Sequence, residues 1–249
     1  MAELDRLIHE EKMEMYSRNT YTDYVRPVIA EFTGVCLFVF VGVLSVNGAG
    51  GNIVAVALAH GMTIALLIMG LGNISGGHFN PAVTLGVAIT GNIKLILAVA
   101  YLLAQTAGGL LGAAFVRAIL TSTEYKNISG GAQVLQSTDT EPGWAILCEG
   151  ILTFILVFTV LMNAVDVKTK NNLAPLAIGF TVAVDILAGG KVTGASMNPA
   201  RTFGPTVVAS PLVDGLWLYH YVYWTYGISS ESDYLFTLTH ISHKKKKDH

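Results

Sequence analysis

The chain has 249 residues, of which 52% are hydrophobic and only 13% are charged, and its formal net charge at pH 7 is -2. A soluble domain carries about 25% charged residues, so this chain has too few charges to cover a soluble globule. The composition argues against a soluble enzyme and a disordered protein, and the near-neutral charge argues against a nucleic-acid binder. The two cysteines, Cys36 and Cys148, lie in apolar runs and indicate core thiols rather than a disulfide framework or a metal site.

Residues 1–27 carry charges of both signs and no apolar core, so they do not resemble a secretory signal peptide and we expect a cytoplasmic tail. Five apolar stretches then approach the length of about 20 residues that a helix needs to cross a hydrocarbon core. Together they predict an all-α membrane protein. The stretches cover residues 28–47, 52–72, 95–120, 144–165 and 173–190.

Two further apolar segments, residues 80–90 and 198–210, are too short to cross a membrane. Each begins with Asn-Pro-Ala and follows a loop that contains Gly and Ser. Because proline suits the first turn of a helix, both segments are predicted to be half-helices that enter the membrane from a loop. Non-helical backbone at membrane depth is tolerated only inside protein or against a water-filled cavity, so these segments indicate a pore.

Loop charges predict which helix ends face the cytoplasm. The loop between the fourth and fifth stretches carries Lys168 and Lys170, whereas residues 121–143 carry mainly acidic charges. The positive-inside rule places the first of these loops in the cytoplasm and the second outside. The tripeptide Asn-Ile-Ser that begins at Asn127 then lies outside, which makes Asn127 a candidate for glycosylation.

The chain contains an internal repeat with a spacing of 118 residues. Four features align at this spacing without a gap. Each half then has an odd number of spans, so the halves insert in opposite orientations and their half-helices meet near the middle of the membrane. The aligned pairs are Glu31 and Glu149, Gly61 and Gly179, Gly76 and Gly194, and Asn80 and Asn198.

Two motifs make the chain resemble a known family. They are Asn80-Pro81-Ala82 after Ser75-Gly76-Gly77-His78-Phe79, and Asn198-Pro199-Ala200-Arg201 after Gly194-Ala195-Ser196-Met197. Residues 28–224 resemble an aquaporin, a major intrinsic protein. The resemblance implies an inverted repeat of transmembrane helices with two re-entrant half-helices, a lipid bilayer as surroundings, and a homotetramer with one pore in each subunit. It implies a passive channel for water and small neutral solutes, with no cofactor, metal or nucleic-acid partner.

Asn80 and Asn198 are predicted to line the pore. Two half-helices that meet end to end place their positive N-termini at the pore centre, each worth about half a positive charge. The amide donors of the two asparagines would hold a passing water by its oxygen, so that this water cannot accept a proton. The alternative is that each asparagine only caps its half-helix, and both roles are compatible.

Three charged residues are expected at membrane depth. Arg201 follows Asn198 by about one helical turn, and a permanent cation there is costly and usually functional, so we expect it to line the pore and repel cations. The alternative is an arginine paired with a buried carboxylate. Glu31 and Glu149 occur in both halves, which favours structural acceptors that hold loop amides over gates.

The resemblance places a narrow selectivity filter at His60, Ile186, Ala195 and Arg201. A strict water channel carries Phe, His, Cys and Arg at these places, and a glycerol channel usually carries Asp directly after the arginine, where Thr202 stands here. The set is similar to the aquaporin-8 type. Ile186 removes one polar wall and Ala195 is small, which predicts passage of ammonia and hydrogen peroxide with water. The alternative for His60 is a histidine satisfied within the core.

The sixth span is expected to be incomplete. An apolar run covers residues 215–228, after which Ser229 to Asp233 are polar or charged. Such residues cost a few kcal/mol each at the centre of a membrane helix. We therefore expect a channel domain at residues 28–228, with repeats at about 28–120 and 144–228, and a lysine-rich tail at residues 229–249. A truncated end, a splice form and an error in the gene prediction are equally compatible with this end.

Three alternatives to a conducting channel follow from the sequence. A non-conducting truncated subunit could modulate full-length partners, because the sixth span lines each pore. An enzyme is not expected, since no nucleophile-elbow or zinc-protease motif occurs. Secondary transport would need titratable coupling sites, for which Asp185 is the one unusual candidate. We expect a multi-pass protein of the plasma membrane, with an intracellular or mitochondrial membrane as the alternative.

Overall fold

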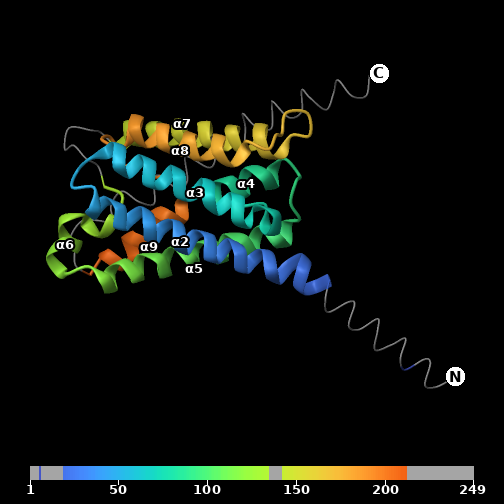
Figure 1. Cartoon of the computed structure of the whole chain (residues 1–249), viewed down its shortest axis with the longest axis horizontal. Helices are drawn as coiled ribbons and strands as arrows, with labels where there is room; N and C mark the ends of the chain where they lie inside the picture. The colour runs from blue at the N-terminus through green and yellow to red at the C-terminus, as the bar shows by residue number, and fades with distance from the viewer. Residues whose placement is uncertain (1–5, 7–18, 135–141, 212–249) are drawn as a thin grey trace.

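The computed structural model describes residue 6, residues 19–134 and residues 142–211. In these ranges the chain forms helices and loops without a β-strand, which confirms the all-α prediction. The longer helices lie side by side along the long axis of the molecule (Figure 1). These are α2 (Arg26–Gly48), α3 (Ile53–Ser75), α5 (Leu95–Ile119), α7 (Pro142–Val160) and α8 (Ala174–Gly189).

Within the part of the chain that the structure describes, four helical segments are long and apolar enough to cross a membrane, and each corresponds to one of the five apolar stretches that the sequence predicts. They are Tyr21–Gly48, Ile53–Ser75, Leu95–Ile119 and Gly143–Val165. The last includes η3 (Leu161–Val165), a π-helical turn that extends α7. The fifth predicted span corresponds to α8, whose 16 residues make it shorter than the others. At 1.5 Å per residue such a helix is about 24 Å long, against about 30 Å of hydrocarbon.

The helix ends follow from local sequence. The side chain of Asn52 accepts hydrogen bonds from the N–H groups of Val54 and Ala55 and so caps α3, which ends where Gly76 takes a left-handed φ of 91°. Helix α2 begins at Arg26, and the π-helical turn η1 (Tyr21–Val25) precedes it. Helical structure therefore reaches into the expected tail of residues 1–27.

The two half-helices form where the Asn-Pro-Ala motifs predict them. Helix α4 (Pro81–Ile89) packs against α5 and α7, and helix α9 (Pro199–Ala209) packs against α2 and α5. Each begins with its proline in the first turn, where the missing N–H costs nothing.

The segment between α5 and α7 folds back on the helices. It contains α6 (Ser122–Asn127) and the 3₁₀ turn η2 (Ser129–Gly131). The side chains of Thr121 and Glu124 form a capping box, and the hydrogen bonds from the hydroxyl and the N–H of Thr121 lower the pKa of Glu124. Tyr125 is fully buried with the guanidinium of Arg117 5.1 Å from its ring centroid, which anchors the segment. Asn127 is exposed.

Helices α3 and α8 cross at two glycines that the repeat makes equivalent. A Cβ on Gly179 would lie 2.5 Å from the carbonyl oxygen of Gly61, and a Cβ on Gly61 would overlap the carbonyl oxygen of Gly179. Small residues at such crossings let helix backbones approach closely. Because each glycine contacts its own repeat mate, the pseudo-twofold axis between the halves runs through this contact.

Several large apolar side chains on these helices remain exposed, as expected for a surface that faces lipid. Examples are Leu66, Leu103, Ile119 and Phe180. The predicted sixth span at residues 215–228 and the tail at residues 229–249 lie outside the described residues.

Candidate functional site

Each asparagine of the two motifs caps its own half-helix. The Oδ1 atom of Asn80 accepts a hydrogen bond from Ala82 N at 2.9 Å. The Oδ1 atom of Asn198 accepts from Ala200 N at 3.0 Å and from Arg201 N at 3.2 Å. These bonds satisfy N–H groups of the first turn and fix the side-chain amides in orientation. Both asparagines therefore cap their half-helices, a role that is compatible with lining a pore.

The amide nitrogens of the same side chains join the two halves. Asn80 Nδ2 donates to the carbonyl oxygen of Met197 at 2.8 Å, and Asn198 Nδ2 donates to the carbonyl oxygen of Phe79 at 2.9 Å. These bonds are equivalent under the repeat. A primary amide has two N–H donors, so each asparagine keeps one N–H beyond the bond to the opposite loop.

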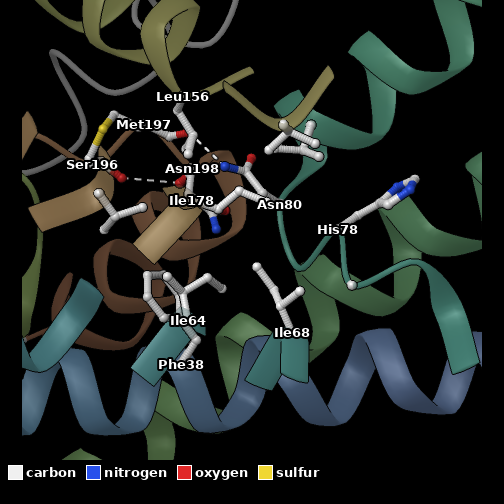
Figure 2. Close-up of a pocket in the computed structure, with 14 residues that line it drawn as sticks. Phe38, Ile64, Ile68, His78, Asn80, Leu156, Ile178, Ser196, Met197 and Asn198 are labelled. Atoms are coloured by element: carbon white, nitrogen blue, oxygen red, sulfur yellow. Dashed lines mark hydrogen bonds between the residues drawn. The ribbon is translucent and has the colours of Figure 1, made fainter. Parts of the chain in front are cut away.

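Both asparagines line a cavity between the half-helices, where Figure 2 shows their side chains next to each other. Its volume of about 20 Å³ exceeds the about 10–15 Å³ that a water molecule needs. The walls are mainly apolar, and the two asparagines, Ser196 and His78 supply polar side chains. A mostly apolar cavity with few polar groups holds water weakly, which suits passage. The apolar wall includes Phe38, Ile64, Ile68, Val83, Leu156, Val160, Ile178 and Val182.

Glu31 holds the loop in front of α4. This fully buried carboxylate accepts hydrogen bonds from Phe79 N at 2.6 Å and from His78 N at 3.0 Å. It also accepts from Ser75 Oγ at 2.6 Å and from Gln105 Nε2 at 2.8 Å. Phe79 has a φ of 46°, a left-handed conformation that is costly outside glycine. Glu31 thus holds the loop in a shape that presents the Phe79 carbonyl to Asn198.

Glu149 does the same in the second half. It accepts hydrogen bonds from Ser196 N at 3.1 Å and Met197 N at 3.0 Å, and from Thr193 Oγ1 at 2.5 Å. Met197 has a φ of 52°, matching Phe79 in the first half. The fourth donor to Glu149 is Gln133 Nε2, from the segment that follows η2.

Arg201 lies in the first turn of α9 and is only 8% exposed. Its Nη1 atom donates to the carbonyl oxygen of Gly131 in η2 at 3.4 Å. Its guanidinium lies within electrostatic range of the Glu149 carboxylate and of the His60 ring. Among the described residues the guanidinium thus has a backbone carbonyl as its hydrogen-bond partner, while the Glu149 carboxylate acts on its charge from a greater distance, as the alternative of a nearby buried carboxylate requires.

His60 lies in α3 and is buried. Its Nδ1 atom is 2.9 Å from the carbonyl oxygen of Val56, and because a carbonyl can only accept, Nδ1 carries the proton and Nε2 is left as an acceptor. No described residue hydrogen-bonds this Nε2 atom. The ring also packs edge-on against Phe38 with 5.7 Å between ring centroids, and it lies against Gly42.

The other two residues of the predicted filter are buried in the apolar core. Ile186 lies in α8, and Ala195 lies in the loop before α9 with a φ of 45°. The structure therefore brings His60 and Arg201 within electrostatic range of each other and buries all four predicted filter residues. Within residues 19–134 and 142–211, no three His, Cys, Asp or Glu side chains gather as a metal site would require.

Several polar residues that support the site were missed by the sequence reasoning. Thr84 and Thr202 occupy equivalent places in the two repeats, so the 118-residue spacing could have revealed them. Gln105 and Gln133 each bond a buried glutamate and one of these threonines, but they are not related by that spacing. The sequence carries no signal for Gln133.

Comparisons with known proteins place the chain among channels. A family profile described as Major intrinsic protein matches residues 18–227. Aquaporin-8 of Mus musculus is 47% identical over 206 residues, which cover 82% of this chain and 77% of that protein. Aquaporin TIP4-4 of Zea mays is 40% identical over 214 residues, which cover 80% of each chain. The fold matches a solved aquaglyceroporin from Plasmodium falciparum with a TM-score of 0.69 at 19% identity, over 87% of this chain and 94% of that one.

Proposed function

Because this chain belongs to the major intrinsic protein family, we propose that its pore conducts water together with ammonia and hydrogen peroxide and excludes ions and protons. Membership of the family itself makes the chain an integral membrane protein and a passive channel for water and small solutes, rather than an enzyme. What we propose beyond family membership is the passage of ammonia and hydrogen peroxide and the exclusion of ions and protons.

The reciprocal asparagine pair is the observation that carries the exclusion of protons. One N–H of each amide is fixed to the opposite loop, and the second is free to donate to a water in the cavity. A water held by its oxygen at both amides cannot accept a proton from its neighbour. The N-termini of α4 and α9 meet at the same place and add about half a positive charge each, which repels cations.

The predicted filter supports passage of small solutes beyond water. Ile186 and Ala195 offer apolar and small surfaces, while His60 Nε2 and Arg201 offer an acceptor and a donor. A neutral molecule such as ammonia or hydrogen peroxide can both donate and accept hydrogen bonds. Aquaporin-8 proteins are among the relatives, which favours the aquaporin-8 type of filter.

We further propose a homotetramer with one pore in each subunit, situated in the plasma membrane, with an intracellular membrane as the alternative. The basis is the family and the exposed apolar side chains of the helices. Chemical cross-linking of the purified protein in nanodiscs would test the tetramer. A ladder that stops at the dimer or the monomer would contradict it.

Stopped-flow light scattering on proteoliposomes tests the channel. An osmotic step measures water, and an outward ammonia gradient measures ammonia. Arg201→Val gives the second half-helix the residue that Val83 supplies in the first, and Lys126→Val changes an exposed cation outside the pore as a control. We expect fast shrinkage in the unchanged protein and in the control, with proton and cation leakage in Arg201→Val.

The polar residues after the apolar run at residues 215–228 favour one second candidate, a non-conducting subunit. In the same vesicles, water permeability equal to that of empty liposomes with confirmed insertion would support this candidate. Reduced flux through a full-length aquaporin reconstituted together with the chain would then identify its role as a modulator.

A further inference from the structure

Each of the two buried glutamates is bonded by a glutamine, and each of these glutamines also bonds a threonine. In the first half Gln105 Nε2 donates to Glu31 Oε2 and to Thr84 Oγ1, both at 2.8 Å. In the second half Gln133 Nε2 donates to Glu149, and Gln133 Oε1 accepts from Thr202 Oγ1 at 2.8 Å. The glutamates and the threonines obey the repeat spacing.

The two glutamines break the repeat. Gln105 comes from α5, a helix of membrane-crossing length that is part of the helical scaffold. Gln133 comes from the segment beyond η2, between α5 and α7, and is only 3% exposed. The glutamine that bonds the buried glutamate and the threonine is therefore supplied by a scaffold helix in one half and by an inter-helix segment in the other.

The segment that carries Gln133 also holds the arginine of the filter. The carbonyl oxygen of Gly131 accepts from Arg201 Nη1, two residues before Gln133. Gln133 then bonds Glu149, which fixes the backbone N–H groups of Ser196 and Met197 directly after Ala195. Gln133 also bonds Thr202, the residue directly after Arg201 on α9. Arg201 is thus covalently next to a residue that Gln133 bonds directly, and Ala195 is next to a residue that Gln133 reaches through Glu149.

We propose that Gln133 is a positioning residue for the selectivity filter, which makes the segment between α5 and α7 a determinant of which solutes pass. This inference rests on the proposed filter at Ala195 and Arg201. Both polar ends of the Gln133 side chain are engaged, so its loss removes one of the four donors to the buried Glu149 and one of the two side-chain partners of the Thr202 hydroxyl, which keeps Ser196 Oγ at 2.6 Å. The loop and the first turn of α9 then gain freedom, and Arg201 can withdraw from the pore.

Gln105 provides a matched control within the same chain. It bonds the same pair of residue types in the first half, where the places equivalent to Ala195 and Arg201 are held by Gly77 and Val83. Loosening that cluster disturbs the loop before α4 without moving a filter side chain. Methionine is the test substitution at both glutamines, because it keeps the unbranched shape and removes the hydrogen bonds.

The first measurement is the ratio of glycerol to water permeability in proteoliposomes of equal protein content. For Gln133→Met we expect this ratio to rise by at least about threefold, because the filter is no longer held at its narrow width. For Gln105→Met we expect water permeability to fall with the ratio unchanged. An unchanged ratio in Gln133→Met, or an equal rise in both variants, would overturn the proposal.

The second measurement keeps the test independent of conduction. Hydrogen–deuterium exchange of the purified protein in nanodiscs follows the backbone amides of residues 193–201 and 75–83. Gln133→Met should speed exchange in residues 193–201 by at least about fivefold and leave residues 75–83 unchanged, and Gln105→Met should do the reverse. If the unchanged protein conducts nothing, the proposed channel fails, and this reciprocal pattern alone decides whether Gln133 positions the loop. Equal exchange in both segments for both variants would refute it.

Discussion

Gly42 and His60 illustrate how one missing side chain leaves room for another on the neighbouring helix. A Cβ on Gly42 would lie 2.5 Å from His60 Nε2 and 2.8 Å from its Cδ2, so the imidazole occupies the space that a side chain on α2 would fill. The ring is fixed at its other edge by the Val56 carbonyl. The position of the His60 ring is therefore set by the Val56 carbonyl and by Gly42, where any side chain would overlap the ring.

Gly42→Ala should displace the His60 ring and lower water permeability several-fold. Overpacking of this kind also costs about 1–3 kcal/mol of stability. The matched control is Gly48→Ala on the same helix, where no atom lies within 4 Å of the added Cβ. Osmotic shrinkage and thermal unfolding in detergent measure both effects. Equal behaviour of the two variants would show that the ring adapts freely.

Ala195 has a left-handed backbone conformation in the loop before α9. Its φ of 45° is unfavourable for alanine, and its repeat mate Gly77, with a φ of 67°, shows what a relaxed residue there looks like. Ala195→Gly should relieve about 1 kcal/mol of strain and widen the filter by one methyl group. We expect urea and glycerol flux to rise while the melting temperature stays level or increases. A fall in both the solute flux and the melting temperature would contradict the filter position assigned to Ala195.

At the scale of the helices, the close approach of α3 and α8 depends on Gly61 and Gly179. Gly61→Ala places a methyl group in the backbone of α8 and should lower thermal stability by about 1–3 kcal/mol. Gly70→Ala on the same helix meets no atom within 4 Å and gains helix propensity, so its stability should stay level or rise by up to about 1 kcal/mol. Parallel melting curves in one detergent provide the comparison. If both variants melt together, the crossing is looser than its geometry indicates.

Helix positions are the part of the fold that the sequence predicts well. Apolar length locates the described spans to within a few residues, and Asn-Pro-Ala locates the start of α4 and α9, because length and capping are local properties. The resemblance adds the filter positions, which no pattern in the chain alone provides. Neither the role of Gln133 nor the contact between Gly42 and His60 can be predicted in this way, because both depend on how different segments pack and no motif marks them.

At the scale of the molecule, the two asparagines act as a joint between the repeats. Each donates to the loop of the opposite half, so the loss of one weakens the contact on which the other depends. Asn80→Ala and Asn198→Ala should each cost about 1–3 kcal/mol of stability. The double variant should cost less than the sum, by about 0.5 kcal/mol or more. Unfolding of the three variants in detergent measures this coupling, and strict additivity would show that the two bonds act separately.

The contact of Gly61 with Gly179 is of the isologous kind, in which a surface meets its own equivalent, as in a twofold-symmetric dimer of separate subunits. The two repeats therefore meet as two such subunits would, although one polypeptide carries both. Because one polypeptide carries both repeats, the two can differ in sequence, whereas the subunits of a homodimer cannot. That freedom is visible at equivalent positions of the two loops and half-helices, where one copy keeps Gly77 and Val83 while the other carries Ala195 and Arg201.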